Sequence, residues 1–450
     1  MQKILILGGG FAGYHVAKGL EKQLKDGEAE VTIVDIRTHM CYQPFLAEVA
    51  SGAIESRHIQ VPLRSHLKKT NVVEAKAKVI DPVNKKVTVK KRDHVWDLEY
   101  DQLVITLGAV TKTFPTPGIA DHAIGLKTTE EAVYIRNKVI ENFSIADSLP
   151  AGDPRRKRLL TFLVVGGGFS GGEGFAEIVD LCHKLLKTHR NIKLEDLELH
   201  LIEAADRILP ELPPQHSQYA IDKMEARGAH VHLKTFVESA VDGVVKTSDG
   251  AEYPTDLIVW TAGTSACPVL RDSDLPLDGR GRLRVRTDLR VEGDDGIVEG
   301  IWGCGDATVC QDLSGGGLPD GSCAPTAQHA LRQANQLVKN LCATLRGGQL
   351  GDYFHNNAGC VAGLGAWIGI FASGKKKLII KGPLAWCMHR GYHGFAMPTW
   401  ERKLRIFGDW TAGLVLGKDV TSTHELERPK AFFQKFAIRP KPKAETEETE

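Results

Sequence analysis

Two glycine fingerprints are the residues of this chain best suited to chemistry. Residues 8–13 read Gly-Gly-Gly-Phe-Ala-Gly and residues 166–171 read Gly-Gly-Gly-Phe-Ser-Gly, each after a short apolar run. In such a fingerprint the first glycine permits a tight turn, the second lets the backbone approach a pyrophosphate, and the third lets a helix pack on a strand. The anion would lie at the helix N-terminus, where N–H groups are unpaired. The pattern assigns dinucleotide binding to Gly8, Gly10, Phe11, Ala12 and Gly13, and to Gly166, Gly168 and Gly171.

Each fingerprint is followed by the same features in the same order. The next apolar run ends in Asp35 after the first copy and in Glu203 after the second, and a later run closes on Gly108 or Gly263. Both acids can accept hydrogen bonds from an adenosine ribose, and Glu203 would repel a 2′-phosphate, which favours NADH over NADPH. Glu203 lies farther from its fingerprint than Asp35 does, which we attribute to a longer helix and loop around residues 183–196. The alternative is that Glu203 is a solvated acid at a strand end.

A third signal lies in residues 302–306, Trp-Gly-Cys-Gly-Asp. An acid at this turn, Asp306, can hold the ribityl hydroxyls of FAD. A helix expected from about Pro325 to Leu345, with the proline in its first turn, would aim the N–H of Ala327 at the flavin pyrimidine edge. Two dinucleotide cradles and a flavin acid together predict a relay that moves a hydride from NADH to FAD.

These motifs require an α/β fold with two Rossmann-like dinucleotide-binding domains, one for FAD and one for NADH. We expect residues 1–118 to form the first part of the FAD-binding domain and residues 119–260 the NADH-binding domain. Residues 261–355 would complete the FAD-binding domain. Residues 356–435 would form a C-terminal region at a membrane surface or dimer interface, and residues 436–450 a disordered tail.

The C-terminal region is basic and aromatic. Residues 371–420 hold nine lysines or arginines against three acids, and Ile406, Trp410 and Leu414 share one face of an expected helix. Basic amphipathic helices with aromatic anchors lie in the lipid interface. The alternative is a helix packed on the body of the protein or on a second subunit.

Composition excludes several other classes. A net charge of +1 gives no electrostatic case for nucleic acid, and nine cysteines without a C-x-x-C pair support neither a metal site nor a disulfide framework. No run is apolar enough for a confident transmembrane helix, and a strand expected from the second residue leaves no room for a secretory signal. We therefore expect a peripheral protein at the cytoplasmic face of the membrane.

The order of motifs resembles that of the type II NADH dehydrogenases, which are NADH:quinone oxidoreductases among the two-dinucleotide-fold flavoproteins. The segments that carry this resemblance are residues 41–52 (CYQPFLAEVASG), 203–210 (EAADRILP), 259–263 (VWTAG), 325–330 (PTAQHA) and 382–386 (GPLAW). The resemblance covers roughly residues 1–420. It implies FAD on Asp35, Ala77 and Asp306, and NADH on Glu203. It also implies an acid near nicotinamide and quinone at Glu173, and a quinone-binding amide at Gln328.

The resemblance further implies a peripheral membrane dimer that reduces menaquinone or ubiquinone without pumping protons. One position departs from the family, because its helix motif A-Q-x-A-x-Q here has Arg332 where the second glutamine is expected, with Gln333 one place later. That step turns a helical side chain by about 100°, so Gln333 should not simply substitute. Arg332 could pair with a reduced quinone oxygen, indicate another acceptor, or be an exposed helix residue.

Three rival hypotheses remain at this level. A soluble disulfide or peroxide reductase would need a flavin-linked thiol pair, and Cys41 has Leu46 where its partner would stand. A related NAD(P)H-dependent flavoprotein reductase would pass electrons to a soluble or protein acceptor docked on the basic C-terminus. A redox-sensing flavoprotein would bind NADH with negligible turnover.

Overall fold

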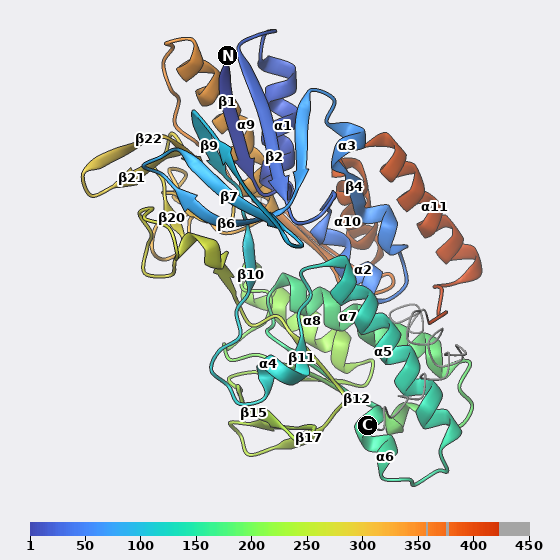
Figure 1. The fold of residues 1–450 in the computed structure, drawn as a ribbon. Helices are drawn as coiled ribbons and strands as arrows, with labels where there is room; N and C mark the ends of the chain where they lie inside the picture. The colour runs from blue at the N-terminus through green and yellow to red at the C-terminus, as the bar shows by residue number, and fades with distance from the viewer. Residues whose placement is uncertain (357–358, 375–377, 423–450) are drawn as a thin grey trace, which may run out of the picture.

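The computed structural model describes residues 1–422 apart from 357–358 and 375–377. Two α/β units lie one above the other in Figure 1, with the C-terminal helices α10 and α11 along one side of the upper unit. The expected disordered tail, residues 436–450, lies outside the described residues.

The upper unit is built on a six-stranded sheet whose strands are parallel except for β21, which runs antiparallel to β22. In sheet order the strands are β21 (Arg290–Gly293), β22 (Gly296–Gly303), β9 (Gln102–Ile105), β1 (Gln2–Leu7), β2 (Ala29–Asp35) and β5 (Thr70–Glu74). Segments before residue 119 and after residue 289 therefore share one sheet. Helices α1 (Phe11–Gln23) and α9 (Ala327–Leu345) pack side by side, and Tyr14, Val16 and Leu20 of α1 are buried.

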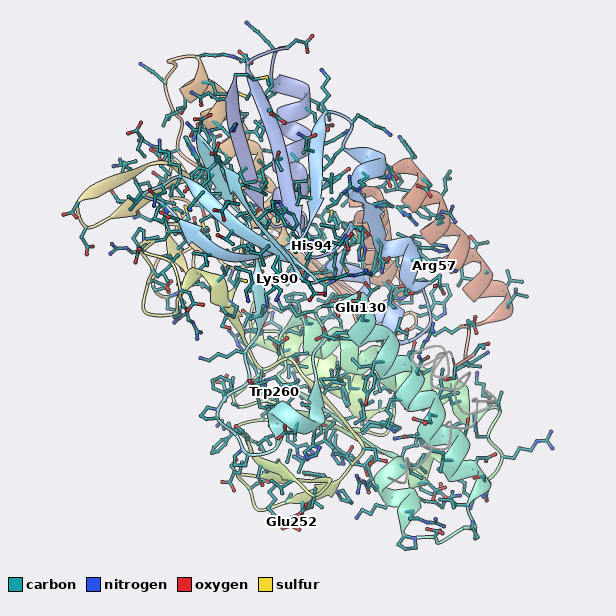
Figure 2. All side chains as sticks on the ribbon, in the orientation of Figure 1. Arg57, Lys90, His94, Glu130, Glu252 and Trp260 are labelled. Carbon is teal, nitrogen blue, oxygen red and sulfur yellow. The ribbon has the colours of Figure 1, made fainter. Side chains whose placement is uncertain are left out.

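Smaller elements complete the upper unit. An antiparallel sheet packs near β1 and β2, and Figure 2 labels Lys90 and His94 on it. Its strands are β6 (Lys76–Asp81), β7 (Lys86–Lys91) and β8 (His94–Glu99). The remaining elements of this unit are β3 (His39–Cys41), η1 (Gln43–Phe45), α2 (Leu46–Ala50), η2 (Ser56–Ile59), β4 (Gln60–Pro62), α3 (Leu63–His66), η4 (Pro268–Leu270), β20 (Leu283–Arg284) and β23 (Thr308–Val309).

The lower unit repeats the plan with a five-stranded parallel sheet. Its strands in order are β11 (Ala123–Ile124), β18 (Leu257–Trp260), β12 (Thr161–Val165), β13 (Glu198–Ile202) and β14 (Ala229–His232). Its other elements are α4 (Ile119–His122), α5 (Thr129–Ser148), α6 (Arg155–Leu159), α7 (Phe169–Leu186), η3 (Leu194–Asp196), α8 (Pro214–Glu225), β15 (Val237–Val241), β16 (Val244–Thr247) and β17 (Glu252–Pro254). Helix α7 has 18 residues where α1 has 13, which accounts for part of the longer spacing to Glu203.

Two crossing strands join the units, β10 (Ala109–Thr111) and β19 (Thr264–Ala266), which pair antiparallel. The indole N–H of Trp260, at the end of β18, donates to the carbonyl of Lys112 at 2.9 Å. Figure 2 labels Trp260 in the lower unit and Glu130 near the junction of the two units. This arrangement places the carboxyl ends of both parallel sheets toward one junction, the edge at which α/β sheets bind ligands.

The C-terminal region adds an antiparallel sheet and two helices. These elements are β24 (Gly359–Gly363), β25 (Gly369–Ser373), β26 (Ile379–Lys381), α10 (Pro383–Ala396) and α11 (Trp400–Leu416). Within the described residues, none of the helices combines the length and apolar character that a bilayer crossing requires.

Helix α11 differs from the expected amphipathic helix. Ile406 and Trp410 are buried against the body of the protein, and the Trp410 ring meets Phe45 at 5.5 Å, whereas Leu414 is 59% exposed. The face formed by Ile406 and Trp410 is therefore a packing face, because it covers the segment 41–52 of the upper unit. A second apolar stripe, which includes Trp400 and Leu404, points to solvent.

Buried ion pairs fix the C-terminal segment across both units. Glu48 of α2 accepts from Arg390 at 3.0 Å and from the indole of Trp410 at 2.8 Å. Lys418 lies 2.6 Å from Glu177 and 3.4 Å from Asp180, both on α7. Glu48 and Glu177 are almost fully buried, so each charge depends on its partner.

Replacing Lys418 by Met should therefore loosen the C-terminal segment, because two buried carboxylates lose their cation. We expect a cost of about 3–5 kcal/mol, measured by urea unfolding and by proteolysis near residue 418. Lys403→Met is the matched control, since Lys403 only covers the Trp400 ring at 4.9 Å, and it should cost under about 1 kcal/mol. Equal effects of both changes would contradict a structural role for the buried pair.

The buried pair of Lys418 and Asp180 makes the stability of the protein depend on pH. Burial raises the pKa of Asp180, but the charges of Lys418 and Arg227 and the backbone N–H of Ala366 leave that pKa below 3.8. Because the folded pKa is depressed, this stabilisation is complete above the pKa of an unfolded aspartate. It is lost as the pH falls below 3.8 toward the folded pKa.

Candidate active site

The two fingerprint loops match each other hydrogen bond by hydrogen bond. Gly8 and Gly166 have φ angles of +101° and +104°, a region open mainly to glycine. The Thr106 hydroxyl lies 2.9 Å from the carbonyls of both Leu7 and Gly8. Thr261 makes the same pair of contacts with Val165 and Gly166 at 2.9 and 3.0 Å. The sequence repeat is therefore a repeat of backbone geometry.

The later glycines of each loop do different work. A Cβ on Gly13 would lie 1.7 Å from the Gly8 carbonyl oxygen, and one on Gly171 would lie 1.8 Å from that of Gly166. A Cβ on Gly10 or Gly168 would meet no protein atom within 4 Å. Both of these glycines are N-caps, of α1 and α7, so open space faces unpaired helix N–H groups. A pyrophosphate fits that space and that polarity.

Gly108 follows β9 of the upper unit, and Gly263 follows β18 of the lower unit. They have φ angles of +64° and +118°, and a Cβ on either would also meet open space. Phe11 and Ala12 are the first two residues of α1, so their N–H groups belong to the unpaired set at its N-terminus.

Asp35 and Glu203 occupy equivalent positions in the two loops. Asp35 accepts from the N–H groups of Gly9 at 2.6 Å and Arg37 at 2.7 Å, and Glu203 accepts from those of Gly167 at 2.5 Å and Ala205 at 2.7 Å. Burial raises the pKa of Asp35, although these backbone donors oppose the shift. A carboxylate offers about four acceptor sites, so each acid retains capacity for ribose hydroxyls. Glu203 is thus part of its loop rather than a merely solvated acid.

Asp306 lies between the starts of two helices. A Cβ on the preceding Gly305 would be 3.3 Å from that of Ala12 on α1 and 3.5 Å from that of Ala330 on α9. Burial raises the pKa of Asp306, with the charges of Lys127 and His329 opposing it. Among the described residues, no group donates a hydrogen bond to this carboxylate. A half-buried acceptor without a donor suits the hydroxyls of a ribityl chain.

Helix α9 begins two residues later than expected. Thr326 is its N-cap and accepts from the N–H of His329 at 3.3 Å, so Ala327 is the first helical residue and Pro325 precedes the helix. The cap is a threonine hydroxyl, which satisfies an end N–H that a proline cannot. The placement of Ala327 at the helix start agrees with the sequence prediction.

Ala77 lies on β6, half-buried and opposite Val89 of β7. The chain reaches it through Ala75, whose N–H donates to the Asp35 carbonyl at 2.9 Å. Ala77 therefore comes just after β5, which pairs with β2, the strand that ends at Asp35.

Glu173 lies within the first two turns of α7 and contacts the C-terminal region. Its Oε1 accepts from the N–H of Gly363 at 2.8 Å and lies 3.3 Å from Nε2 of His389. Burial lowers the pKa of His389, but the nearby carboxylates of Glu173 and Glu48 more than offset it and raise that pKa. His389, beside Glu173, therefore keeps its proton to a higher pH than an ordinary histidine does.

Protic groups continue from His389 toward the first fingerprint. The His389 and His393 rings lie 4.9 Å apart, His393 Nδ1 lies 3.1 Å from the Tyr42 hydroxyl, and the Tyr42 ring lies 5.3 Å from Phe11. Sequence reasoning missed both histidines. Their spacing of four residues on one face of α10 was the available signal.

Gln328 reaches the same small sheet from the other side. Its Nε2 donates to the Gly359 carbonyl at 3.0 Å, so Gln328 and Glu173 contact the two ends of β24. Gln333 is 2% exposed and its Oε1 accepts from the N–H of Gly305 at 2.8 Å. Gln333 thus supports the Asp306 turn. Arg332 is half-buried and donates to the Gln328 carbonyl at 3.2 Å. Of the three alternatives for Arg332, an exposed helix residue is therefore wrong.

Cys41 is not a reactive thiol. Burial raises its pKa to about 12, and a thiol rather than a thiolate is a poor nucleophile. In the described part of the chain, His, Cys, Asp and Glu side chains form no group of three suited to a metal ion.

Comparison with known proteins agrees with this geometry. The model of the family "Pyridine nucleotide-disulphide oxidoreductase" matches residues 2–334. Demethylphylloquinone reductase NdbB of Synechocystis is 30% identical over 416 residues, which cover 91% of this chain and 95% of that protein. The type II NADH:quinone oxidoreductase of Haemophilus influenzae is 27% identical over 413 residues, covering 86% and 91%.

Other relatives are longer. The chain spans about half the length of the Arabidopsis external alternative NAD(P)H-ubiquinone oxidoreductase B3, to which it is 32% identical over 314 residues (66% of this chain, 53% of that protein). The solved structure of NDH2 from Plasmodium falciparum in complex with NADH has the same fold, with a TM-score of 0.85 at 19% identity over 93% of this chain and 99% of that one. The chain belongs to the pyridine nucleotide-disulphide oxidoreductase family, and within that family it groups with the type II NADH:quinone oxidoreductases.

Proposed function

We propose that this protein is an FAD-dependent NADH:quinone oxidoreductase that does not pump protons. The observation that carries the proposal is that Glu173, on the helix that begins at the second loop, and Gln328, at the start of α9, contact opposite ends of β24. The three relatives are named as a demethylphylloquinone reductase, an NADH:quinone oxidoreductase and an NAD(P)H-ubiquinone oxidoreductase, and these names support a quinone acceptor over the alternative of a soluble or protein acceptor.

The residues of this chain have distinct roles in that reaction. When bound, FAD supplies the carrier that takes a hydride from NADH and passes two electrons to the quinone. The first loop with Asp35, Ala77 and Asp306 would hold FAD, and the second loop with Glu203 would hold NADH. The N-terminus of α9 at Ala327 would stabilise negative charge at the flavin. Gln328 would orient the quinone head group, and the Glu173–His389 pair would supply a proton to it.

One anaerobic experiment tests the proposal. The purified protein, loaded with FAD, should lose its flavin absorbance rapidly on addition of NADH and regain it when a menaquinone or ubiquinone analogue is added. Regain only with a soluble acceptor such as ferricyanide would favour the alternative reductase. A colourless protein that takes up no FAD would overturn the proposal as a whole.

We further propose that the protein binds the cytoplasmic face of a membrane peripherally. Large apolar side chains on α10 and α11 point to solvent: Leu384, Tyr392, Phe395, Trp400, Leu404, Phe407, Leu414, Val415 and Leu416. Lys403 and Arg405 lie beside this stripe on α11. Apolar side chains flanked by cations suit an interface with anionic lipid.

Vesicle binding tests this surface. Trp400→Ser with Leu404→Ser should weaken binding to phosphatidylcholine–phosphatidylglycerol vesicles by about 3 kcal/mol, roughly a hundredfold. Val83→Ser with Val95→Ser is the control, because these exposed valines lie in the β6–β7 turn and on β8 of the upper unit, away from α10 and α11. Unchanged flotation of the first variant would remove the lipid role. If that variant instead turns a dimer into a monomer in the ultracentrifuge, the stripe is the homodimer interface.

A further inference from the structure

A pair of cysteines faces each other in the hairpin between Asp306 and α9. Gln311 and Ser322 pair antiparallel. On either side of them, Cys323 N–H donates to the Cys310 carbonyl at 2.8 Å and Asp312 N–H donates to the Gly321 carbonyl at 2.9 Å. Cys310 and Cys323 are therefore directly opposite one another, with both side chains on the same face of the hairpin.

The two sulfurs lie close to the same backbone oxygen. Each lies within hydrogen-bonding distance of the Gln311 carbonyl oxygen, at 3.6 Å for Cys310 and 3.7 Å for Cys323. Directly opposed residues have Cα atoms about 5.5 Å apart when hydrogen-bonded, which lies inside the range of disulfides. A bond between these sulfurs therefore needs little backbone movement.

The surroundings make the two thiols unequal. Interaction with the Cys310 thiol, together with interaction with His329, lowers the pKa of Cys323, while burial and the charge of Asp312 oppose this. Interaction with Cys323, together with burial, raises the pKa of Cys310. The imidazole of His329 is held by the Tyr353 hydroxyl at 2.9 Å. Cys323, at 8% exposed against 2% for Cys310, is therefore the thiol of the pair that loses its proton more readily.

We propose that Cys310 and Cys323 form a redox-active dithiol that hydrogen peroxide oxidises to an intrachain disulfide. The Cys323 thiolate attacks one peroxide oxygen, the O–O bond breaks, and hydroxide leaves while Cys323 becomes a sulfenic acid. The Cys310 sulfur then attacks the Cys323 sulfur, the S–S bond forms, the S–O bond breaks, and the Cys310 proton leaves with the hydroxyl as water. The dithiol loses two electrons and the peroxide gains them.

Mass spectrometry of the full-length, FAD-loaded protein tests the pair. After limiting hydrogen peroxide and alkylation of free thiols, we expect a peptide pair joined through Cys310 and Cys323, which dithiothreitol separates. In Cys310→Ser, Cys323 should instead be trapped by dimedone as a sulfenic acid. Cys342→Ser should leave disulfide formation unchanged. Cys387 is the internal comparison, because it is exposed but has no paired thiol in the described structure.

The pH dependence of alkylation tests the role of His329. The midpoint for Cys323 should lie below the value of about 8.5 for an ordinary thiol, and His329→Asn should move it upward. Oxidation of Cys387 before Cys323, or independent alkylation of Cys310 and Cys323 after peroxide, would overturn the proposal. The readout needs neither NADH nor a quinone, so its failure is separate from failure of the proposed function.

Discussion

A protein with Gly10→Ala should fold normally and be purified without FAD. The added Cβ meets no protein atom within 4 Å, and Gly10 has an extended backbone that alanine adopts. The Cβ would instead enter the space through which a pyrophosphate reaches the start of α1. Loss of hydrogen bonds to the charged phosphates should cost about 3 kcal/mol, roughly a hundredfold in Kd. Flavin absorbance per protein and the thermal unfolding midpoint measure the two effects separately.

The second loop provides the matched variant. Gly168→Ala also places its Cβ in open space, so this protein should keep FAD while its KM for NADH rises roughly a hundredfold. Gly13→Ala provides the opposite control, because its Cβ would lie 1.7 Å from the Gly8 carbonyl oxygen. That change should destabilise the fold by more than about 3 kcal/mol. Normal FAD and NADH binding in both open-space variants would refute the assignment of the loops.

Glu173→Gln should slow quinone reduction by about a hundredfold while FAD stays bound. Glutamine keeps an acceptor for the Gly363 N–H, so the contact with β24 survives, but the negative charge beside His389 is lost. Without that charge the pKa of His389 falls, because burial then dominates. Steady-state turnover and anaerobic reoxidation by quinone measure the loss.

The pH profile separates a proton-donor role from a structural one. In the unaltered protein, quinone reduction should fall as the pH rises through the raised pKa of His389, and in Glu173→Gln this limb should move to lower pH. Glu130→Gln is the control, since Glu130 is an exposed acid at the start of α5 whose nearest cation is Arg37 at 3.8 Å. Unchanged turnover of Glu173→Gln with several quinones would remove Glu173 from the mechanism.

Much of the candidate site could be predicted from local sequence. Gly8 and Gly166 must adopt positive φ, Gly13 and Gly171 must lack a side chain, and acids must follow the second strand of each unit. These are requirements of a short segment of backbone, so residue types at fixed spacing reveal them. The duplication of the loops made the prediction of two dinucleotide-binding domains specific, and family membership confirms that fold class.

The remaining features depend on contacts between distant segments. Nothing in the sequence near His389 places it 3.3 Å from Glu173, and the pairing of Cys310 with Cys323 depends on a hairpin of irregular loop residues. The sequence of α11 was ambiguous for the same reason. This helix has one apolar face with Ile406 and Trp410 and another with Trp400 and Leu404, and only packing decides which of the two is covered. Periodicity reports that a face is apolar but does not identify its partner.

The sequence by itself therefore determined the two glycine loops and the acids that bond to them, because backbone conformation and glycine placement are local properties. Only the tertiary structure decided which acid contacts which histidine, which cysteines are opposed, and which face of α11 is left to solvent. Those outcomes follow from burial and charge pairing between residues far apart in the chain. Such interactions contribute free energy only after folding has brought the segments into contact.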